Sequence, residues 1–201
     1  MKKLFLTSAK LDALLSLISG NPTGKKVAFI PTAGDPYEDK WFIELAKKQL
    51  SEMGFELTEV DLKDKKKDDL LGTLQEVDIV FVAGGNTFYL LEKVRESGFD
   101  QVLPILLDKG IIYAGESAGA VLACPTIEPV KFMDEPSKAP NLKSFEGLGL
   151  VDFVVLPHYG TEFSEAVFEQ LKAEYGNKGF KLIPLTNDQS IIVENDSYKI
   201  V

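Results

Sequence analysis

The sequence predicts a single α/β domain over residues 1–201, a three-layer α/β/α sandwich with a mostly parallel central sheet. Short apolar runs alternate with amphipathic segments along most of its 201 residues, as in consecutive strand-helix-strand units. The runs at 27–30 and 79–82 are apolar without alternation, which is typical of parallel strands covered on both faces. Two further runs around a turn at Asn195-Asp196 predict a small antiparallel hairpin at the C-terminal end.

The elements follow from the periodicity of apolar residues and from turn residues. Residues 40–53 place apolar side chains at helical spacing between charged ones, and Gly54 supplies a C-terminal stop. Strands are expected at 4–7, 26–31, 55–61, 79–82, 111–114, 154–157 and 180–184, with the hairpin at 190–193 and 198–201. Helices are expected at 11–18, 40–53, 69–76, 87–97, 99–109, 118–123 and 162–175.

Composition limits the classes of partner and the compartment. The formal net charge is −9 and no face rich in lysine or arginine is apparent, which argues against a nucleic-acid or anionic-membrane partner. Cys124 is the only cysteine, so an intrachain disulfide is excluded and a reducing cytoplasm is expected. The apolar run near the start stops after three residues, and no segment approaches the length of a membrane span. A cytoplasmic protein is expected, and its oligomeric state is left open.

The most informative motif is Gly115-Glu116-Ser117-Ala118-Gly119, which lies between a predicted strand and a predicted helix. This is the G-x-S-x-G pattern of a nucleophile elbow, in which a tight turn exposes the serine hydroxyl at a helix N-terminus. The alternative interpretation is a turn that is built from small residues and has no catalytic role. In the strand-to-helix context, Ser117 is the candidate nucleophile.

A nucleophilic serine needs a base within hydrogen-bond reach and a third group that orients the base. His158 is the only histidine of the chain, and it follows the predicted strand at 154–157. The carboxyl ends of parallel strands meet at one edge, so His158 and Ser117 are expected to share it, although a lone histidine is often structural. For the orienting acid, Asp188 follows a late strand, whereas Asp134 lies in an irregular segment; chain order allows either.

Backbone donors for an oxyanion are expected from two places. Gly84-Gly85-Asn86 follows the strand at 79–82 and opens the next helix, and Ala118 directly follows the candidate nucleophile. A glycine-rich turn with an asparagine cap is the alternative interpretation of the first segment. Glu116 has two possible roles, which are to fix the elbow or to contact an amine of a ligand.

Other site classes have little support in the sequence. The chain lacks a phosphate-binding glycine motif, and a single histidine with scattered carboxylates shows no metal-ligand spacing. No cofactor or metal is therefore expected. Residues 125–149 are rich in proline and charge and lack periodicity, and a loop of this length is more often functional than incidental.

The motifs resemble those of the aspartyl dipeptidase (dipeptidase E) family of serine peptidases, which is related to cyanophycinases and, more distantly, to class I glutamine amidotransferase domains. The resemblance rests on the residues at 84–88, on the elbow with Ala-Cys-Pro-Thr-Ile at 123–127, and on Pro157-His158. It implies an α/β/α sandwich with Ser117 as nucleophile and His158 as base. The third triad member then looks like Asp188, with Asp134 as the alternative. A glutamine amidotransferase would need cysteine at the elbow.

The resulting hypothesis is a serine peptidase that hydrolyses short peptides, possibly dipeptides with N-terminal aspartate, through an acyl-enzyme. Recognition of aspartate usually calls for arginine, and Arg95 is the only arginine of the chain, so the aspartyl preference stays open. Two alternatives remain: an esterase or other amide hydrolase with the same triad, and a non-catalytic module that binds a ligand.

Overall fold

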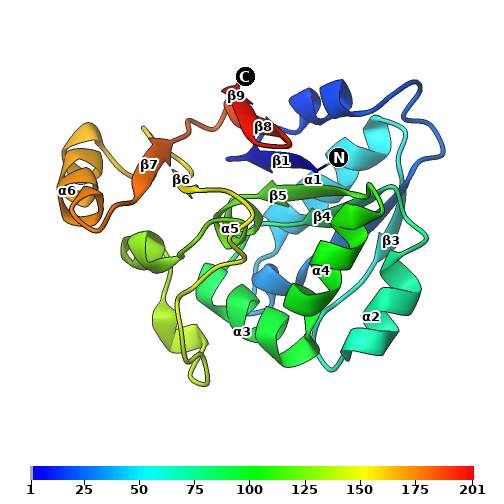
Figure 1. The fold of residues 1–201 in the computed structure, drawn as a ribbon, viewed down its shortest axis with the longest axis horizontal. Helices are drawn as coiled ribbons and strands as arrows, with labels where there is room; N and C mark the ends of the chain where they lie inside the picture. Colours follow the sequence, from blue (N-terminus) through cyan, green and yellow to red (C-terminus); the bar gives the residue numbers. More distant parts are fainter. Residues whose placement is uncertain (1) are drawn as a thin grey trace.

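A computed structural model describes residues 2–201, and its centre is a seven-stranded sheet in the order β3-β2-β4-β5-β1-β8-β9 (Figure 1). Strands β3, β2, β4, β5 and β1 are parallel to their neighbours, and β8 runs antiparallel to β1. The bounds are β1 Lys3–Thr7, β2 Lys26–Ile30, β3 Glu56–Glu59, β4 Ile79–Val82, β5 Ile112–Glu116, β8 Ser190–Glu194 and β9 Ser197–Ile200. The predicted mostly parallel sheet is confirmed.

Helices cover both faces of this sheet. One apolar cluster packs α1 and a short 3₁₀ helix, η1, against the first face, and a larger cluster packs α2 to α5 against the second. The bounds are η1 Asp12–Leu17, α1 Trp41–Glu52, α2 Lys67–Leu74, α3 Thr87–Ser97, α4 Phe99–Asp108 and α5 Ala118–Leu122. The three-layer α/β/α arrangement follows from these two covered faces. No helix within residues 2–201 is both long enough and apolar enough to cross a bilayer.

Two details differ from the sequence-based expectation. The first predicted helix is a 3₁₀ helix, because Leu11, Leu14 and Leu17 are buried at a spacing of three, which matches three residues per turn. The C-terminal hairpin is part of the central sheet, since β8 pairs along β1 with Leu4 opposite Val193.

The larger difference concerns the two strands that precede the hairpin. Strands β6 (Phe153–Leu156) and β7 (Lys181–Pro184) pair in parallel with each other in a separate two-stranded sheet. They cannot extend the central sheet beside β1, because β8 occupies that edge. Helix α6 (Glu165–Gly176) connects them, and Figure 1 shows this small layer at the left, beside the end at which β1 and β5 terminate.

Candidate active site

Ser117 stands on a tight turn between β5 and α5. Its backbone adopts φ 48° and ψ −109°, a strained conformation for a residue with a side chain, and its N–H donates to the Thr7 carbonyl at 2.9 Å. A Cβ on Gly119 would lie 2.1 Å from the Val82 carbonyl oxygen, and one on Gly115 would lie 2.3 Å from the Gly119 oxygen. Both glycines of the motif are therefore needed for close strand-helix packing, as the elbow geometry requires.

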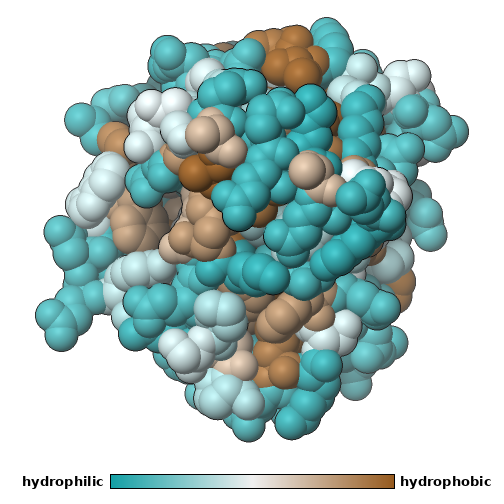
Figure 2. All heavy atoms as spheres, turned by 90° about the vertical axis from the view of Figure 1, so that its left-hand side faces the viewer, coloured by the Kyte–Doolittle hydropathy of each residue, from teal (hydrophilic) through white to brown (hydrophobic). Residues whose placement is uncertain are grey.

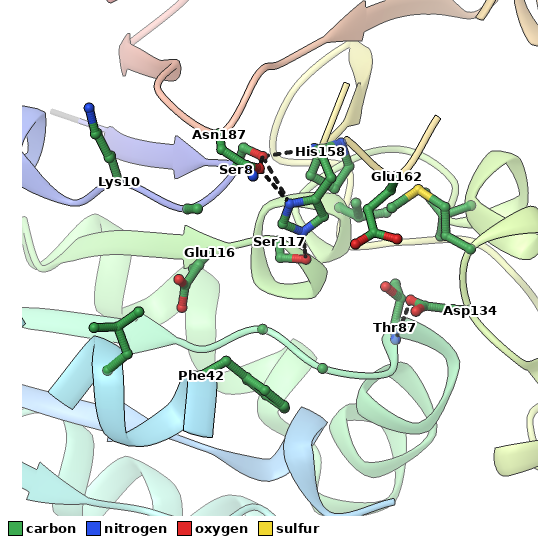
Figure 3. Close-up of a pocket in the computed structure, with 18 of the residues that line it drawn as sticks. Ser8, Lys10, Phe42, Thr87, Glu116, Ser117, Asp134, His158, Glu162 and Asn187 are labelled. Atoms are coloured by element: carbon green, nitrogen blue, oxygen red, sulfur yellow. Dashed lines mark hydrogen bonds between the residues drawn. The ribbon is translucent and has the colours of Figure 1, made fainter. Parts of the chain in front are cut away.

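His158 lies within hydrogen-bond distance of this serine. Its Nε2 is 2.8 Å from Ser117 Oγ, as the dashed line in Figure 3 shows. His158 follows β6 with φ 65°, and its N–H donates to Ser8 Oγ at 2.8 Å. Ser8 directly follows β1, so the turn that presents the imidazole is tied to the central sheet.

The group behind the imidazole is Asn187, in the segment that follows β7. Asn187 Oδ1 lies 2.7 Å from His158 Nδ1 and accepts from the Ser8 hydroxyl at 3.1 Å. An amide oxygen can only accept, so Nδ1 must carry the proton in this contact. Nε2 is then free to accept the hydroxyl proton of Ser117, which is the tautomer that a general base needs.

Neither aspartate considered for this position contacts His158. Asp188 forms an ion pair with Lys10 at 2.6 Å, and its side chain is 73% exposed. The expectation for Asp188 therefore needs correction, because its neighbour Asn187 occupies the position behind the imidazole. Asp134 is half-buried, and its Oδ2 accepts the Thr87 N–H at 2.9 Å at the start of α3. Figure 3 shows Asp134 beside Thr87, away from Asn187.

The expected oxyanion donors divide into two groups. The N–H groups of Gly85 and Ala118 donate to no other group within residues 2–201, and Gly85 lines the cavity whereas Ala118 is buried beside it. Gly84 packs against the nucleophile, since a Cβ there would lie 3.2 Å from Ser117 Cβ. Asn86 does not line the cavity; it is 1% exposed and caps α3 through its side-chain oxygen, which accepts from the Tyr89 N–H.

One cavity of about 520 Å³ is lined by Ser117, His158 and Asn187 together with Gly84 and Gly85. Its wall also includes Val130 and Met133 of the long 125–149 loop. The face of the molecule on which the parallel strands end shows apolar side chains recessed among hydrophilic ones (Figure 2). Glu116 also lines the cavity, and burial raises its pKa to about 8, although the Gly84 N–H partly counteracts this. Within residues 2–201 no group of three or more histidine, cysteine, aspartate or glutamate side chains could hold a metal ion.

Two members of this arrangement, Ser8 and Asn187, were not expected from the sequence. Both follow strands, as Ser117 and His158 do, so the same signal marked them. Serine and asparagine in loops are common, however, and the acidic neighbour Asp188 offered the more familiar chemistry.

Comparison with known proteins identifies the family. The model of peptidase family S51 matches residues 5–201. An uncharacterized peptidase of Listeria innocua, Lin0382, is 37% identical over 98% of this chain and 94% of its own length. A peptidase E of Salmonella typhimurium is 34% identical over 78% of this chain and 66% of its own.

Solved structures agree as well. A candidate peptidase E from Listeria monocytogenes EGD-e has a TM-score of 0.90 and 33% identity, with 100% of this chain and 98% of that chain covered. A peptidase from an acI-B1 actinobacterium shares the fold, with a TM-score of 0.69 and 20% identity over 100% of this chain and 87% of its own. The chain that carries this serine-histidine pair therefore belongs to peptidase family S51, a family of serine peptidases.

Proposed function

We propose that this protein is a serine peptidase that hydrolyses short peptides with Ser117 as nucleophile, His158 as general base and Asn187 as the group that orients the base. The 2.8 Å contact between Ser117 Oγ and His158 Nε2, on a strained elbow, carries the proposal. The family supports a peptidase; the assignment of each residue and the choice of substrate are inferences from the geometry.

In the first half-reaction, Ser117 Oγ attacks the peptide carbonyl carbon while Nε2 of His158 takes the hydroxyl proton. The carbonyl oxygen becomes an oxyanion, and the free N–H groups of Gly85 and Ala118 are positioned to stabilise it. The C–N bond then breaks, and His158 returns the proton to the departing amine. An acyl-enzyme ester on Ser117 and a free amine are the products of this half.

Water completes the cycle. His158 takes a proton from the water as it attacks the ester, and it returns that proton to Ser117 Oγ when the C–O bond breaks. Asn187 holds the imidazole in the required tautomer throughout, but a neutral amide adds no charge that stabilises the imidazolium. Ser8 fixes Asn187 in turn, through the hydroxyl that donates to Oδ1.

The cavity favours small substrates. A volume of about 520 Å³ suits a small ligand of a few residues, and the 125–149 loop contributes to the wall. A preference for N-terminal aspartate lacks a cationic partner, because Arg95 pairs with Asp100 and donates to the carbonyls of Glu146 and Gly147. Arg95 also does not line the cavity. We therefore propose short peptides without aspartyl selectivity.

The decisive experiment compares wild type with Ser117→Ala on a panel of unblocked di- and tripeptides and on simple acyl esters. We expect peptide turnover that falls by at least about 10³-fold in the variant, with unchanged circular dichroism. A fluorophosphonate should label wild type at Ser117 only. Full activity in Ser117→Ala would refute the assignment, and turnover of esters without peptides would favour the esterase alternative.

A further inference from the structure

The carboxyl group of Glu116 lines the cavity directly beside Ser117 in the chain, and the proposed reaction does not use it. Its Oε2 is shielded from water and has no hydrogen-bond partner within residues 2–201, while the side chain as a whole lines the cavity and is partly exposed. Figure 3 shows it beside Ser117, on the side away from His158 and Asp134. A shielded carboxyl oxygen without a hydrogen-bond partner costs stability, so its presence next to a nucleophile calls for a functional reason.

The charges around the cavity favour a positively charged ligand. Four carboxylates line it: Glu116, Asp134, Glu162 and Asp188. The one lysine of the lining, Lys10, is already paired with Asp188 at 2.6 Å. Within residues 2–201, no lysine or arginine forms an ion pair with the other three. The cavity is therefore lined by more acidic than basic side chains, a surplus that a ligand cation would balance.

The same cavity has an aromatic wall whose composition suits an ammonium group. Tyr37, Trp41 and Phe42 line the cavity and form edge-to-face contacts, with ring centroids 5.9 Å apart for Tyr37–Phe42 and 6.0 Å for Trp41–Phe42. Trp41 is 64% exposed, an unusual position for a large aromatic side chain without a ligand. Aromatic faces attract cations, so these rings and the carboxyl are complementary to the same group.

We propose that Glu116 is the specificity-determining residue of this site and binds the ammonium group of the substrate, in a cavity whose aromatic side chains Tyr37, Trp41 and Phe42 also favour a cation. This inference rests on the proposed peptidase function and deepens it. The ammonium group is either the free α-amino group of the peptide or the side-chain amine of its first residue. The raised pKa agrees, because the carboxyl is largely protonated in the empty site and a bound cation would favour its ionised form.

The test uses two matched substrate pairs at constant pH. Alanyl-leucine is compared with propionyl-leucine, which lacks the α-amino group, and N-acetyl-lysyl-leucine with N-acetyl-norleucyl-leucine, which lacks the side-chain amine. We expect wild type to prefer the amine in one pair by at least about tenfold in kcat/KM, and Glu116→Gln to lose that preference by slowing only the amine substrate. The pair that responds identifies the source of the ammonium group.

Glu92→Gln is the matched control, because Glu92 is a buried glutamate outside the cavity that accepts the Asn141 N–H. It should keep the preference of wild type. Equal turnover of both members of each pair by wild type would overturn the inference. So would a Glu116→Gln variant that slows both members equally, since that result indicates a structural role.

Binding separates this inference from the proposed catalysis. Calorimetry measures ligand binding to the Ser117→Ala variant and to the double variant Ser117→Ala/Glu116→Gln. The first ligand pair is alaninamide and propionamide. The second pair is Nα-acetyl-lysinamide and Nα-acetyl-norleucinamide. Amine-selective binding that requires Glu116 would support the ammonium site even if no peptide were hydrolysed. Absence of amine-selective binding would overturn it even if Ser117-dependent turnover were found.

Discussion

The central sheet and the small β6–β7 sheet contribute different halves of the site, and they are built differently. The central part supplies Ser117 and the Gly84-Gly85 turn from strands that are buried along their length. The small part supplies His158 and Asn187, and its helix α6 buries only Leu171 and Tyr175. Ser117 thus stands on the buried central sheet, whereas the position of His158 depends on how a thinner layer packs beside it.

The contact between the two parts is itself polar. Ser8 accepts the His158 N–H and donates to Asn187 Oδ1, so one hydroxyl at the end of β1 fixes both residues of the small part. A displacement of the small part would therefore move His158 out of the site and leave Ser117 in place. The two halves should therefore respond differently to substitution, pH and local unfolding.

The largest difference is expected from glycine substitutions in the two parts. Gly119→Ala places a Cβ 2.1 Å from a backbone oxygen of β4, which cannot move, so we expect a loss of at least about 4 kcal/mol or failure to fold. Gly176→Ala in α6 meets nothing within 4 Å and should be neutral or stabilise by up to about 1 kcal/mol. Urea unfolding measures the free energy of unfolding of both variants. Losses of similar size would contradict the expected difference between the two parts.

The second effect concerns the buried carboxyl of the central part. Burial raises the pKa of Glu116 from 4.5 to about 8, so the folded state holds a proton that the unfolded state releases in this range. This contribution to stability is complete below pH 4.5 and is lost as the pH rises towards 8. At about 1.4 kcal/mol for each pH unit, the loss has an upper limit of about 5 kcal/mol.

Glu116→Gln removes this titration. Relative to wild type, the variant should gain stability between pH 5 and pH 8.5, by several kcal/mol. Urea unfolding of both proteins at these two pH values measures the change, with Glu92→Gln as the control for loss of a buried glutamate. A constant difference between variant and wild type across this range would show that Glu116 does not titrate as stated.

A smaller effect is expected at Asn187 in the small part. Asn187→Ala removes the acceptor at His158 Nδ1, and kcat/KM should fall by roughly 10²-fold, with little change in the free energy of unfolding. Asn187→Asp keeps the acceptor and adds a charge that stabilises the imidazolium, so the acidic limb of the pH profile should move to higher pH. Retention of full activity in Asn187→Ala would remove the orienting role.

The smallest difference should appear in amide hydrogen exchange of the unmodified protein. Amides of β7 and α6 should open with a free energy about 1–3 kcal/mol below that of β4 and β5, because fewer of their side chains are buried. A uniform exchange pattern would show that the two parts unfold together. The central and small sheets would then differ in geometry but not in local stability.

Much of this molecule could be predicted from local sequence. The alternation of apolar runs predicted the covered parallel sheet, and the small residues at 115 and 119 predicted the elbow, because a tight strand-helix turn excludes Cβ atoms. His158 was predicted to lie at a strand end, and it does. These features depend on residues close together in the chain, where periodicity and steric limits act directly.

The remaining features were decided by tertiary structure. Asn187 and Asp188 are neighbours in one loop, and only the packing of that loop turns the amide towards His158 and the carboxylate towards Lys10. Strands β6 and β7 form a sheet of their own because β8 pairs with the edge of β1. That pairing joins segments that are far apart in the sequence. The raised pKa of Glu116 and its unpaired Oε2 likewise depend on everything folded around them, since desolvation is a property of the whole cavity rather than of a motif.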